Sequence, residues 1–320
     1  MENTNSNDQG VVIKKNLGQY HVQSGGKTIP CALSSRLHKQ WIYSSAHAQS
    51  VPYTEQVDLV AIGDQVRFVA VGNNRGMIVE VLPRRNQFSR PAPRPGIQQI
   101  EQVIAANLDL VVPVFAAANP TPKWGLLDRY LVATEAAGLE ALICISKLDL
   151  VRTDPELKAV VDTYKQIGYP VIQVSALTGA GLDELQLALQ GRVSVLVGKS
   201  GVGKSSLLNA LQPGLELRVQ ELSRIHKGKH TTSYLEMFPL QNGGALMDTP
   251  GIREFGLWDL YAEELAECFP EMRPYLGQCK FGANCRHDEE PGCAVRKAVM
   301  TGRVSPLRYK NYMRLLEELP

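Results

Sequence analysis

Residues 198–205 have the composition and spacing of a phosphate-binding loop. They read GKSGVGKS, follow the apolar run VSVLV and precede the helical run SSLLNAL. In this context backbone N–H groups of the loop and of the helix terminus bind phosphate oxygens, Lys204 reaches the β- and γ-phosphates, and Ser205 ligates Mg²⁺. A glycine-rich turn without a ligand is the alternative, but it does not explain the flanking strand and helix. The predicted nucleotide-contacting residues of this loop are Gly198, Lys199, Ser200, Gly201, Val202, Gly203, Lys204, Ser205 and Ser206.

An acidic motif follows at the end of another apolar strand. Asp248 begins the tetrapeptide DTPG, which ends at Gly251 and lies 43 residues after Ser205. An acidic residue on a neighbouring strand end can hold Mg²⁺ through water, and the N–H of the glycine can face the γ-phosphate. Alone, DTPG could be any turn, but its place after a strand predicts that Asp248 is the second magnesium residue.

A polar segment at 223–233, between these motifs, is the predicted switch loop. It contains His230, Thr231 and Thr232. A threonine in such a loop senses the γ-phosphate and Mg²⁺. Either of the two threonines could do so.

The residue that would orient the attacking water is not at its usual place. In Ras-like enzymes a glutamine follows the DxxG glycine, whereas Ile252 occupies that position here. We therefore expect slow intrinsic turnover, with His230 as the candidate water-orienting group or general base. An exposed loop histidine with no catalytic role is the alternative.

Residues 146–149 have the pattern of a guanine-reading motif at the end of the apolar run ALICI. Ser146, Lys147, Leu148 and Asp149 are similar to the NKxD motif of GTPases. In that motif the Asp carboxylate accepts hydrogen bonds from guanine and the Lys packs along the ring. Ser146 replaces the usual asparagine, so we expect one amide contact to be lost and guanine preference to depend mainly on Asp149.

A second base-contacting loop is predicted at Ser175 and Ala176, after the run PVIQ, where a backbone amide meets the guanine oxygen. Both base-reading segments precede the phosphate-binding loop, whereas in ordinary GTPases they follow it. The permuted order is possible because such sites are assembled from strand ends and chain termini usually lie close together at the surface. The segment after Gly251 then leads directly into the C-terminal part of the chain.

Three of the six cysteines lie within residues 279–293, together with a histidine. In a reducing compartment this clustering indicates a metal rather than disulfides. Three thiolates and one imidazole match the ligand set of a structural zinc ion, with no open position for catalysis. Free buried cysteines are the alternative. The predicted ligands of one zinc ion are Cys279, Cys285, His287 and Cys293.

The elements that must position the nucleotide groups alternate between strands and helices over residues 98–258. This alternation is typical of a parallel α/β sheet with crossover helices. The strands are expected at 108–117, 140–149, 169–176, 192–198, 234–240 and 244–251, and the helices at 125–138, 155–168 and 181–190.

The N-terminal region reads instead as short strands separated by turns, which is typical of a small β-barrel of the OB or SH3-like kind. We place a disordered tail at 1–10, the barrel at 11–90 and a Pro-rich linker at 91–97. The barrel strands are expected at 11–15, 19–23, 28–33, 57–62, 64–71 and 77–82.

Charge is unevenly distributed along the chain. Residues 1–100 hold 11 Lys and Arg against 6 Asp and Glu, whereas the rest of the chain holds 23 against 26. The basic N-terminal end suits contact with a phosphate backbone. A solvated charged surface is the alternative.

Residues 259–320 are expected to form a helical zinc-binding domain. Its last helix should begin with Ser305 as N-cap and Pro306 as first residue. The basic residues of that helix, Arg308 among them, could dock on RNA or form an ordinary solvated face. No run approaches the roughly 20 apolar residues that span a bilayer, and the N-terminus lacks a secretory pattern, so we expect a cytoplasmic protein without membrane contact.

In the order of its parts the chain resembles the RsgA (YjeQ) family of small ribosomal subunit biogenesis GTPases. A basic barrel, a permuted GTPase region and a Cys3His segment follow one another, and KGKHTTS, DTPGIREFGL and CKFGANCRHDEEPGCAV look like the switch and zinc segments of that family. The gap between the first two cysteines is one residue longer than is common there. The resemblance implies an RNA-binding OB-fold, GTP hydrolysis stimulated by the small (30S) subunit, and a role late in the maturation of that subunit.

We therefore expect a magnesium-dependent, monomeric GTPase that binds the small ribosomal subunit and its rRNA and converts GTP to GDP and phosphate. One rival is a P-loop ATPase or kinase, for which ATP would compete with GTP at similar affinity. The other is a nucleic-acid-binding module whose nucleotide site is only structural, for which small subunits would not accelerate hydrolysis.

Overall fold

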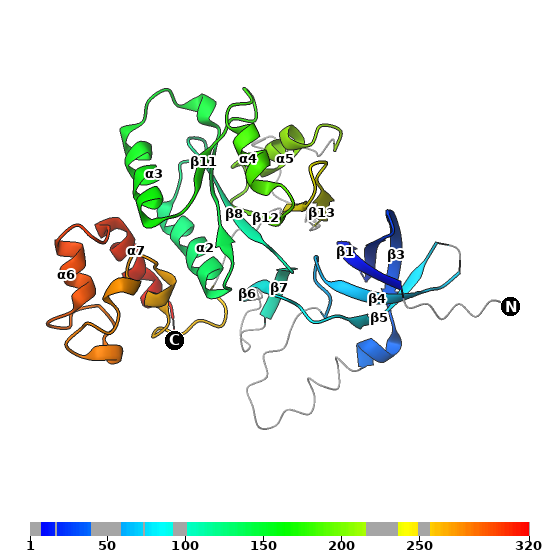
Figure 1. Cartoon of the computed structure of the whole chain (residues 1–320), viewed down its shortest axis with the longest axis horizontal. Helices are drawn as coiled ribbons and strands as arrows, with labels where there is room; N and C mark the ends of the chain where they lie inside the picture. The colour runs from blue at the N-terminus through cyan, green and yellow to red at the C-terminus, as the bar shows by residue number, and fades with distance from the viewer. Residues whose placement is uncertain are drawn as a thin grey trace, which may run out of the picture.

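The molecule consists of three parts that follow one another along the chain. A barrel, a central α/β domain and a C-terminal domain occur in the order that the sequence predicts, with the central domain between the other two (Figure 1). The computed structural model describes residues 8–16, 18–39, 59–72, 74–91, 101–215, 236–248 and 257–319.

Five of the described strands form a closed N-terminal barrel. They are β1 (Asp8–Asn16), β2 (Gln19–Ser24), β3 (Lys27–Leu33), β4 (Gln65–Ala70) and β5 (Gly76–Val81). They pair in the order β1, β2, β3, β5, β4, and β4 closes back onto β1. Alternate residues point inward, as the period of two in a strand requires, and enclose a core that includes Val12, Val22, Phe68 and Ile78.

Two expectations for the barrel were wrong. Residues 8–10, expected in the tail, belong to β1 and pair with β4, for example Gln9 with Arg67. Backbone hydrogen bonds between β1 and β4 close the barrel, so residues 8–10 can belong to it without apolar side chains. Residues 59–62, expected within a strand, contain an isolated bridge from Ile62 to Ala105 of the central part. The other predicted tail residues, 1–7, lie outside the described residues.

The central domain is a mainly parallel sheet with helices on both faces. Its elements are β8 (Leu110–Ala116), α2 (Trp124–Ala136), β9 (Glu140–Ala141), β10 (Ile143–Ser146), α3 (Pro155–Ile167), β11 (Val171–Gln173), α4 (Leu182–Leu189), β12 (Val193–Val197), α5 (Lys204–Leu211), β13 (Glu236–Pro239) and β14 (Ala245–Asp248). The strand order is β11, β10, β8, β12, β14, β13, with β13 antiparallel to β14. One apolar cluster joins α2 and α3 to the sheet, and a second joins α4 and α5 to its other face.

Local sequence signals set the ends of α3. The Asp154 side chain accepts a hydrogen bond from the Leu157 N–H at 3.0 Å, and Pro155 is the first helical residue. Gly168 ends the helix with φ of +111°, in the left-handed region that favours glycine. An N-cap aspartate, a proline at the first helical position and a glycine after the last one are sequence signals that predict the ends of a helix.

A two-stranded sheet connects the barrel to the central domain. It pairs β6 (Gln87–Pro91) with β7 (Glu101–Ala106) in antiparallel fashion. The strands on either side of the predicted linker at 91–97 are therefore paired with each other, and residues 92–97 of that linker lie outside the described residues. Phe88, which we expected in the barrel, packs in the apolar core of the central domain.

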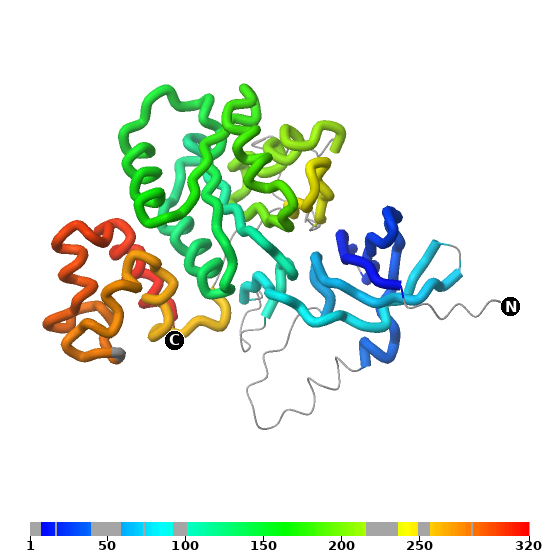
Figure 2. The backbone as a smooth tube through the Cα atoms, in the orientation of Figure 1, coloured from blue at the N-terminus to red at the C-terminus, as the bar shows by residue number. Residues whose placement is uncertain are grey.

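The C-terminal domain consists mainly of short turns followed by two helices. Its elements are η2 (Leu265–Cys268), η3 (Arg273–Tyr275), η4 (Gly282–Asn284), α6 (Ala294–Met300) and α7 (Pro306–Leu316). Helix α7 begins where the sequence predicts, although the Ser305 side chain makes no capping hydrogen bond. Figure 2 shows this domain on the side of the central domain away from the barrel. No helix among the described residues is both long and apolar enough to cross a membrane.

Candidate functional site

Three strands of the central sheet bring the predicted nucleotide motifs to one edge. The carboxyl ends of β10, β12 and β14 lead into the base motif, the phosphate-binding loop and the acidic motif, respectively. In open α/β sheets, ligands bind outside the carboxyl ends of the parallel strands. Segments at about 146, 198 and 248 are far apart in sequence, and the sheet brings them to the same edge, with β8 between β10 and β12.

The phosphate-binding loop between β12 and α5 depends on glycines. Gly198 has φ of +154°, and a Cβ there would lie 2.4 Å from the Val114 carbonyl oxygen. Gly201 and Gly203 also have positive φ, +82° and +98°. The loop can therefore approach a ligand with its backbone, as a phosphate cradle requires.

Lys204 projects back into this loop from the first position of α5. Its amine donates to the carbonyl oxygens of Gly198 at 2.7 Å and Lys199 at 3.2 Å. Burial lowers the pKa of Lys204, and the nearby Asp248 carboxylate opposes that shift. A buried ammonium group held inside a ring of backbone groups is suited to the β- and γ-phosphates of a nucleotide.

Ser205 and Asp248 meet at the expected magnesium position. The Ser205 hydroxyl donates to one oxygen of the Asp248 carboxylate at 3.0 Å. Asp248 is buried at the end of β14, and its strand neighbour in the ladder is Leu196 of β12. Both groups supply hard oxygen ligands of the kind that Mg²⁺ prefers, and both adjoin the phosphate-binding loop. Ser206, the next predicted contact, lies in the first turn of α5.

Ser146 links the base motif to the phosphate-binding loop. Its buried hydroxyl donates to the carbonyl oxygen of Val202 in the loop and lies 3.2 Å from the Phe115 carbonyl oxygen. The serine that replaces the usual asparagine therefore still contacts the loop through its hydroxyl. The sequence could not show this contact, because the two segments are 56 residues apart.

Lys147 and Asp149 are held by separate contacts. Lys147 has φ of +57°, and its amine donates to the Asn119 carbonyl oxygen, so the loop after β8 contributes to the site. Burial lowers the pKa of Lys147, and Asp149 opposes the shift. The Ser175 hydroxyl donates to the Asp149 carboxylate at 2.5 Å. Asn119 is a residue that our sequence reasoning missed.

The two predicted base-reading loops thus meet. Leu148 opens η1 (Leu148–Leu150), and its N–H donates to the Val174 carbonyl oxygen at 3.1 Å. Ser175 is buried, whereas Asp149 is exposed and Ala176 is half-buried. Ser175 therefore fixes the orientation of the Asp149 carboxylate from its buried side, while Asp149 remains accessible to a base.

The four predicted metal ligands converge in the C-terminal domain. Cys279, Cys285, His287 and Cys293 are all buried, and their ligand atoms lie within 4.8 Å of one another. The Nδ1 atom of His287 is 3.5 Å from the sulfurs of both Cys279 and Cys293, and those two sulfurs are 3.9 Å apart.

The three distances among Cys279, His287 and Cys293 fit a tetrahedral zinc ion. Zn–S and Zn–N bonds of normal length at tetrahedral angles put two sulfurs about 3.8 Å apart and a sulfur and a nitrogen about 3.6 Å apart. Backbone N–H groups also point at the sulfurs, from Ala294 to Cys279 at 3.2 Å and from Arg296 to Cys293 at 3.4 Å. Such N–H groups stabilise thiolates, so the donor set and its surroundings both suit a structural metal.

Four predicted site residues lie outside the described residues. They are His230, Thr231, Thr232 and Gly251.

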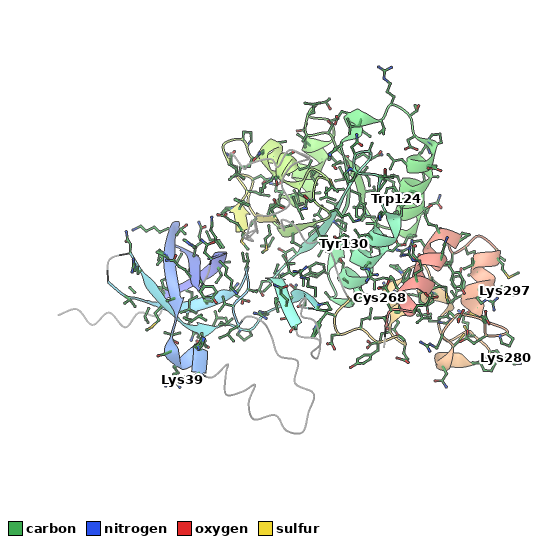
Figure 3. The ribbon with its side chains drawn as sticks, turned by 180° about the vertical axis from the view of Figure 1, so that it is seen from behind. Lys39, Trp124, Tyr130, Cys268, Lys280 and Lys297 are labelled. Carbon is green, nitrogen blue, oxygen red and sulfur yellow. The ribbon has the colours of Figure 1, made fainter. Side chains whose placement is uncertain are left out.

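Arg308 corrects the expectation that the basic residues of the last helix face RNA or solvent together. Its guanidinium is fully buried and pairs with Asp128 of α2 at 2.5 Å and with Glu271 at 2.7 Å. By contrast, two other basic residues of this domain, Lys280 and Lys297, lie on its outer side and face away from the central domain (Figure 3). Arg308 therefore docks this domain onto α2 instead of exposing its charge.

The chain is similar to proteins of one family. A family model described as RsgA GTPase matches residues 81–258. The small ribosomal subunit biogenesis GTPase RsgA of Azotobacter vinelandii is 47% identical over 261 residues, which cover 81% of this chain and 74% of that protein. The crystal structure of YjeQ from Thermotoga maritima matches with a TM-score of 0.74 and 30% identity, covering 98% of both chains. That of YloQ, a circularly permuted GTPase, matches with a TM-score of 0.69 and 30% identity, covering 99% of this chain and 96% of that one.

The sheet order, the phosphate-binding loop and these likenesses define a circularly permuted P-loop GTPase. The chain belongs to the RsgA GTPase family, and it is a GTP-hydrolysing enzyme. The family resemblance inferred from the order of the motifs is confirmed.

Proposed function

We propose that this GTPase acts in late maturation of the small ribosomal subunit and hydrolyses GTP when it binds that subunit. The observation that carries the proposal is the meeting of the base motif, the phosphate-binding loop and Asp248 at one sheet edge. This arrangement occurs in a chain whose relatives are named small ribosomal subunit biogenesis GTPases.

In the proposed site Asp149 accepts hydrogen bonds from guanine, Lys147 packs along the base, and Ser175 with Ala176 supports the second base contact. The support is the Ser175 to Asp149 hydrogen bond, which fixes the orientation of the carboxylate. Asp149 is an acceptor when ionised, so it favours a base that presents donors, as guanine does on its Watson–Crick edge.

The loop at 198–206 holds the phosphates in this proposal, with Lys204 at the β- and γ-phosphates. Ser205 and Asp248 hold Mg²⁺, the latter through water, and the bound ion neutralises charge that develops on the β- and γ-oxygens. The 3.0 Å separation of the Ser205 and Asp248 oxygens supports this assignment.

The hydrolytic groups are proposed from the sequence. Ile252 occupies the place of the usual glutamine, so water would be oriented by His230 or by a group of the partner. Thr231 or Thr232 and the N–H of Gly251 would sense the γ-phosphate. GTP would order residues 223–233 and the segment after Gly251, and hydrolysis would relax both.

The remaining parts have supporting roles in this proposal. The Cys3His cluster holds one structural zinc ion, which the interatomic distances support. The basic barrel binds rRNA, which its charge supports. We further propose that the protein acts as a monomer in the cytoplasm.

The decisive experiment measures GTP hydrolysis with and without purified small subunits, for the wild type and for His230→Ala. We expect subunits to accelerate the wild type and to accelerate the variant far less, because the loop histidine completes the site. Lys158→Ala is a matched control, since that side chain is exposed on α3 and pairs with Asp162 on the same helix. Equal rates in all four main measurements would refute the mechanism.

A second experiment tests the base assignment with Asp149→Asn. We expect the variant to lose preference for GTP over ATP, because the amide presents a donor where guanine also presents donors. Thr163→Ala on α3 serves as the control. Unchanged nucleotide preference would favour a P-loop ATPase or kinase instead.

A further inference from the structure

Strand β1 of the barrel extends the sheet of the central domain at its β13 edge. Lys14 of β1 is paired with Glu236 of β13, and the Lys14 amine lies 2.7 Å from the Glu236 carboxylate. The two residues are 222 positions apart. The contact therefore exists only because the barrel docks on this edge.

Glu236 is also the direct cross-strand partner of Asp248. In the antiparallel pair of β13 and β14, Glu236 lies opposite Asp248, and in the next pair Asp248 lies beside Leu196 of β12. Directly opposite residues in such a ladder project from the same face, with Cβ atoms about 5 Å apart. Lys14, Glu236 and Asp248 thus form one row that runs from the barrel to the proposed magnesium position.

The packing of the neighbouring residues identifies the face that this row occupies. Met237 and Met247 pack in the cluster on the α2 and α3 face, whereas Phe238 and Leu246 belong to the cluster on the α4 and α5 face. Side chains alternate along a strand, so Glu236 and Asp248 share the α4 and α5 face. Lys14 is the register partner of Glu236 and its amine reaches the Glu236 carboxylate, which puts Lys14 on the same face as the two carboxylates. That face carries α5 and the phosphate-binding loop.

Two carboxylates in directly opposite positions repel each other. Without a cation, Glu236 would add a negative charge beside Asp248, where the triphosphate and Mg²⁺ are expected. Lys14 supplies the compensating charge and draws the Glu236 carboxylate toward the barrel. The side chains of Lys14 and Glu236 are 32% and 29% exposed, so the pair is partly solvated.

We propose that Lys14 is a positioning residue for GTP hydrolysis. It neutralises Glu236 and holds the Glu236 carboxylate away from the proposed magnesium site. This inference rests on the proposed role of Asp248 and extends it to the barrel. Docking of the barrel then sets the charge that Mg²⁺ and the γ-phosphate experience. A barrel that moved away from β13 would weaken binding of the magnesium–GTP complex.

The test measures KM and kcat for magnesium–GTP in the full-length protein. In Lys14→Ala the uncompensated Glu236 repels the phosphates and competes for Mg²⁺, so we expect KM to rise roughly three- to ten-fold with kcat nearly unchanged. Raising the salt concentration should shrink this effect, because screening weakens the repulsion. Lys14→Arg should keep the wild-type KM.

The deciding variants are Glu236→Gln and the double variant Lys14→Ala with Glu236→Gln. Both break the ion pair, but neither leaves a free carboxylate, so both should have a KM close to that of the wild type. A purely structural tether predicts the opposite, with KM raised equally in all three variants that break the pair. Arg67→Ala is the matched control, because it breaks the 3.1 Å pair between Arg67 and Glu80 within the barrel.

Three results would overturn the inference. An unchanged KM in Lys14→Ala would do so, as would a double variant as impaired as Lys14→Ala. Hydrolysis by the wild type that is indifferent to Mg²⁺ would overturn the proposed magnesium site and this inference together. The first two results would leave the proposed function intact.

Discussion

At the C-terminal junction of the central domain the Arg308 guanidinium is fully buried between Asp128 and Glu271, whereas at the barrel junction the Lys14 amine and the Glu236 carboxylate are about a third exposed. The guanidinium also lies 4.5 Å from the centre of the Phe269 ring. Both junctions have an ion pair between domains, but the pair at the C-terminal junction is fully buried and the pair at the barrel junction is partly solvated.

This difference teaches which junction can change. Removing one partner of a buried pair leaves an uncompensated charge in the interior, which costs about 3–5 kcal/mol, whereas an exposed pair contributes about 0–1 kcal/mol. The C-terminal domain is therefore docked firmly on α2. The Lys14–Glu236 ion pair, by contrast, can open at little cost, while Ile13 keeps β1 packed against the central core.

The barrel junction also has a tight backbone contact away from Lys14. Gly63 has φ of +89°, and beside it the Ala106 N–H donates to the Ile62 carbonyl oxygen at 2.9 Å. The Asn107 side chain donates to the Gly63 carbonyl oxygen at 2.9 Å. The barrel is thus fixed at Gly63 and loosely held at Lys14.

The largest expected effect comes from removal of the proposed zinc ion. A structural zinc site contributes on the order of 10 kcal/mol to folding, so a zinc-selective chelator should abolish hydrogen-exchange protection across residues 279–304. GTP binding should survive, because the nucleotide site lies in the central domain. Cys285→Ser should act like the chelator, and Cys268→Ala, at a buried cysteine outside the cluster, is the control. Full protection after verified metal loss would contradict a structural role.

Asp128→Ala should come next in size. It removes a partner of Arg308 and leaves the hydroxyl of Tyr164 without its 2.6 Å acceptor. We expect unfolding in urea to become easier by about 3–5 kcal/mol. Adding both Arg308→Met and Glu271→Gln should recover part of this loss, because the Glu271 carboxylate would otherwise be left buried without its cation. A loss of unfolding free energy below about 1 kcal/mol would show that the buried Arg308–Asp128 pair does not hold the C-terminal domain on α2.

Gly63→Ala tests the fixed point of the barrel junction. A Cβ at this position would lie 2.1 Å from the Ala106 carbonyl oxygen, so we expect a loss of roughly 2 kcal/mol or more from strain and displacement. Gly25→Ala is the matched control, since Gly25 also has positive φ but no atom within 4 Å of the added Cβ. Its loss should be about 1 kcal/mol. Equal losses in thermal unfolding would mean that the close contact at Gly63 adds nothing.

Lys14→Ala should have the smallest effect on stability. The pair with Glu236 is partly exposed, so we expect a change below about 1 kcal/mol in urea unfolding, and a smaller one at high salt. The same variant is expected to change KM for magnesium–GTP. A stability loss as large as that of Asp128→Ala would erase the contrast between the two junctions.

Much of the candidate site could be predicted because its motifs are local. The loop at 198–205 needs particular glycines and a lysine within a few residues, and strand ends in a parallel sheet must share an edge. The cysteine cluster is similarly short, so the convergence of its four side chains could be predicted from spacing alone. The fold class and the GTPase family followed from the order of these motifs, and both are confirmed.

Contacts between distant segments could not be predicted in this way. Arg308 has the sequence signature of an exposed helical cation, but Asp128 is 180 residues away and only the docked domain buries the pair. The Ser146 hydroxyl bonds to Val202, and Phe88 leaves the barrel for the central core, for the same reason.

By itself, the sequence of this protein determined the local chemistry: the phosphate-binding loop, the base motif, the acidic strand end and the Cys3His set. The tertiary structure alone decided which charges are buried and which pairs join the domains, as Arg308 and Lys14 show. The physical reason is that backbone geometry and ligand spacing are encoded within a few residues. The environment of a charge depends on segments that folding brings together from opposite ends of the chain.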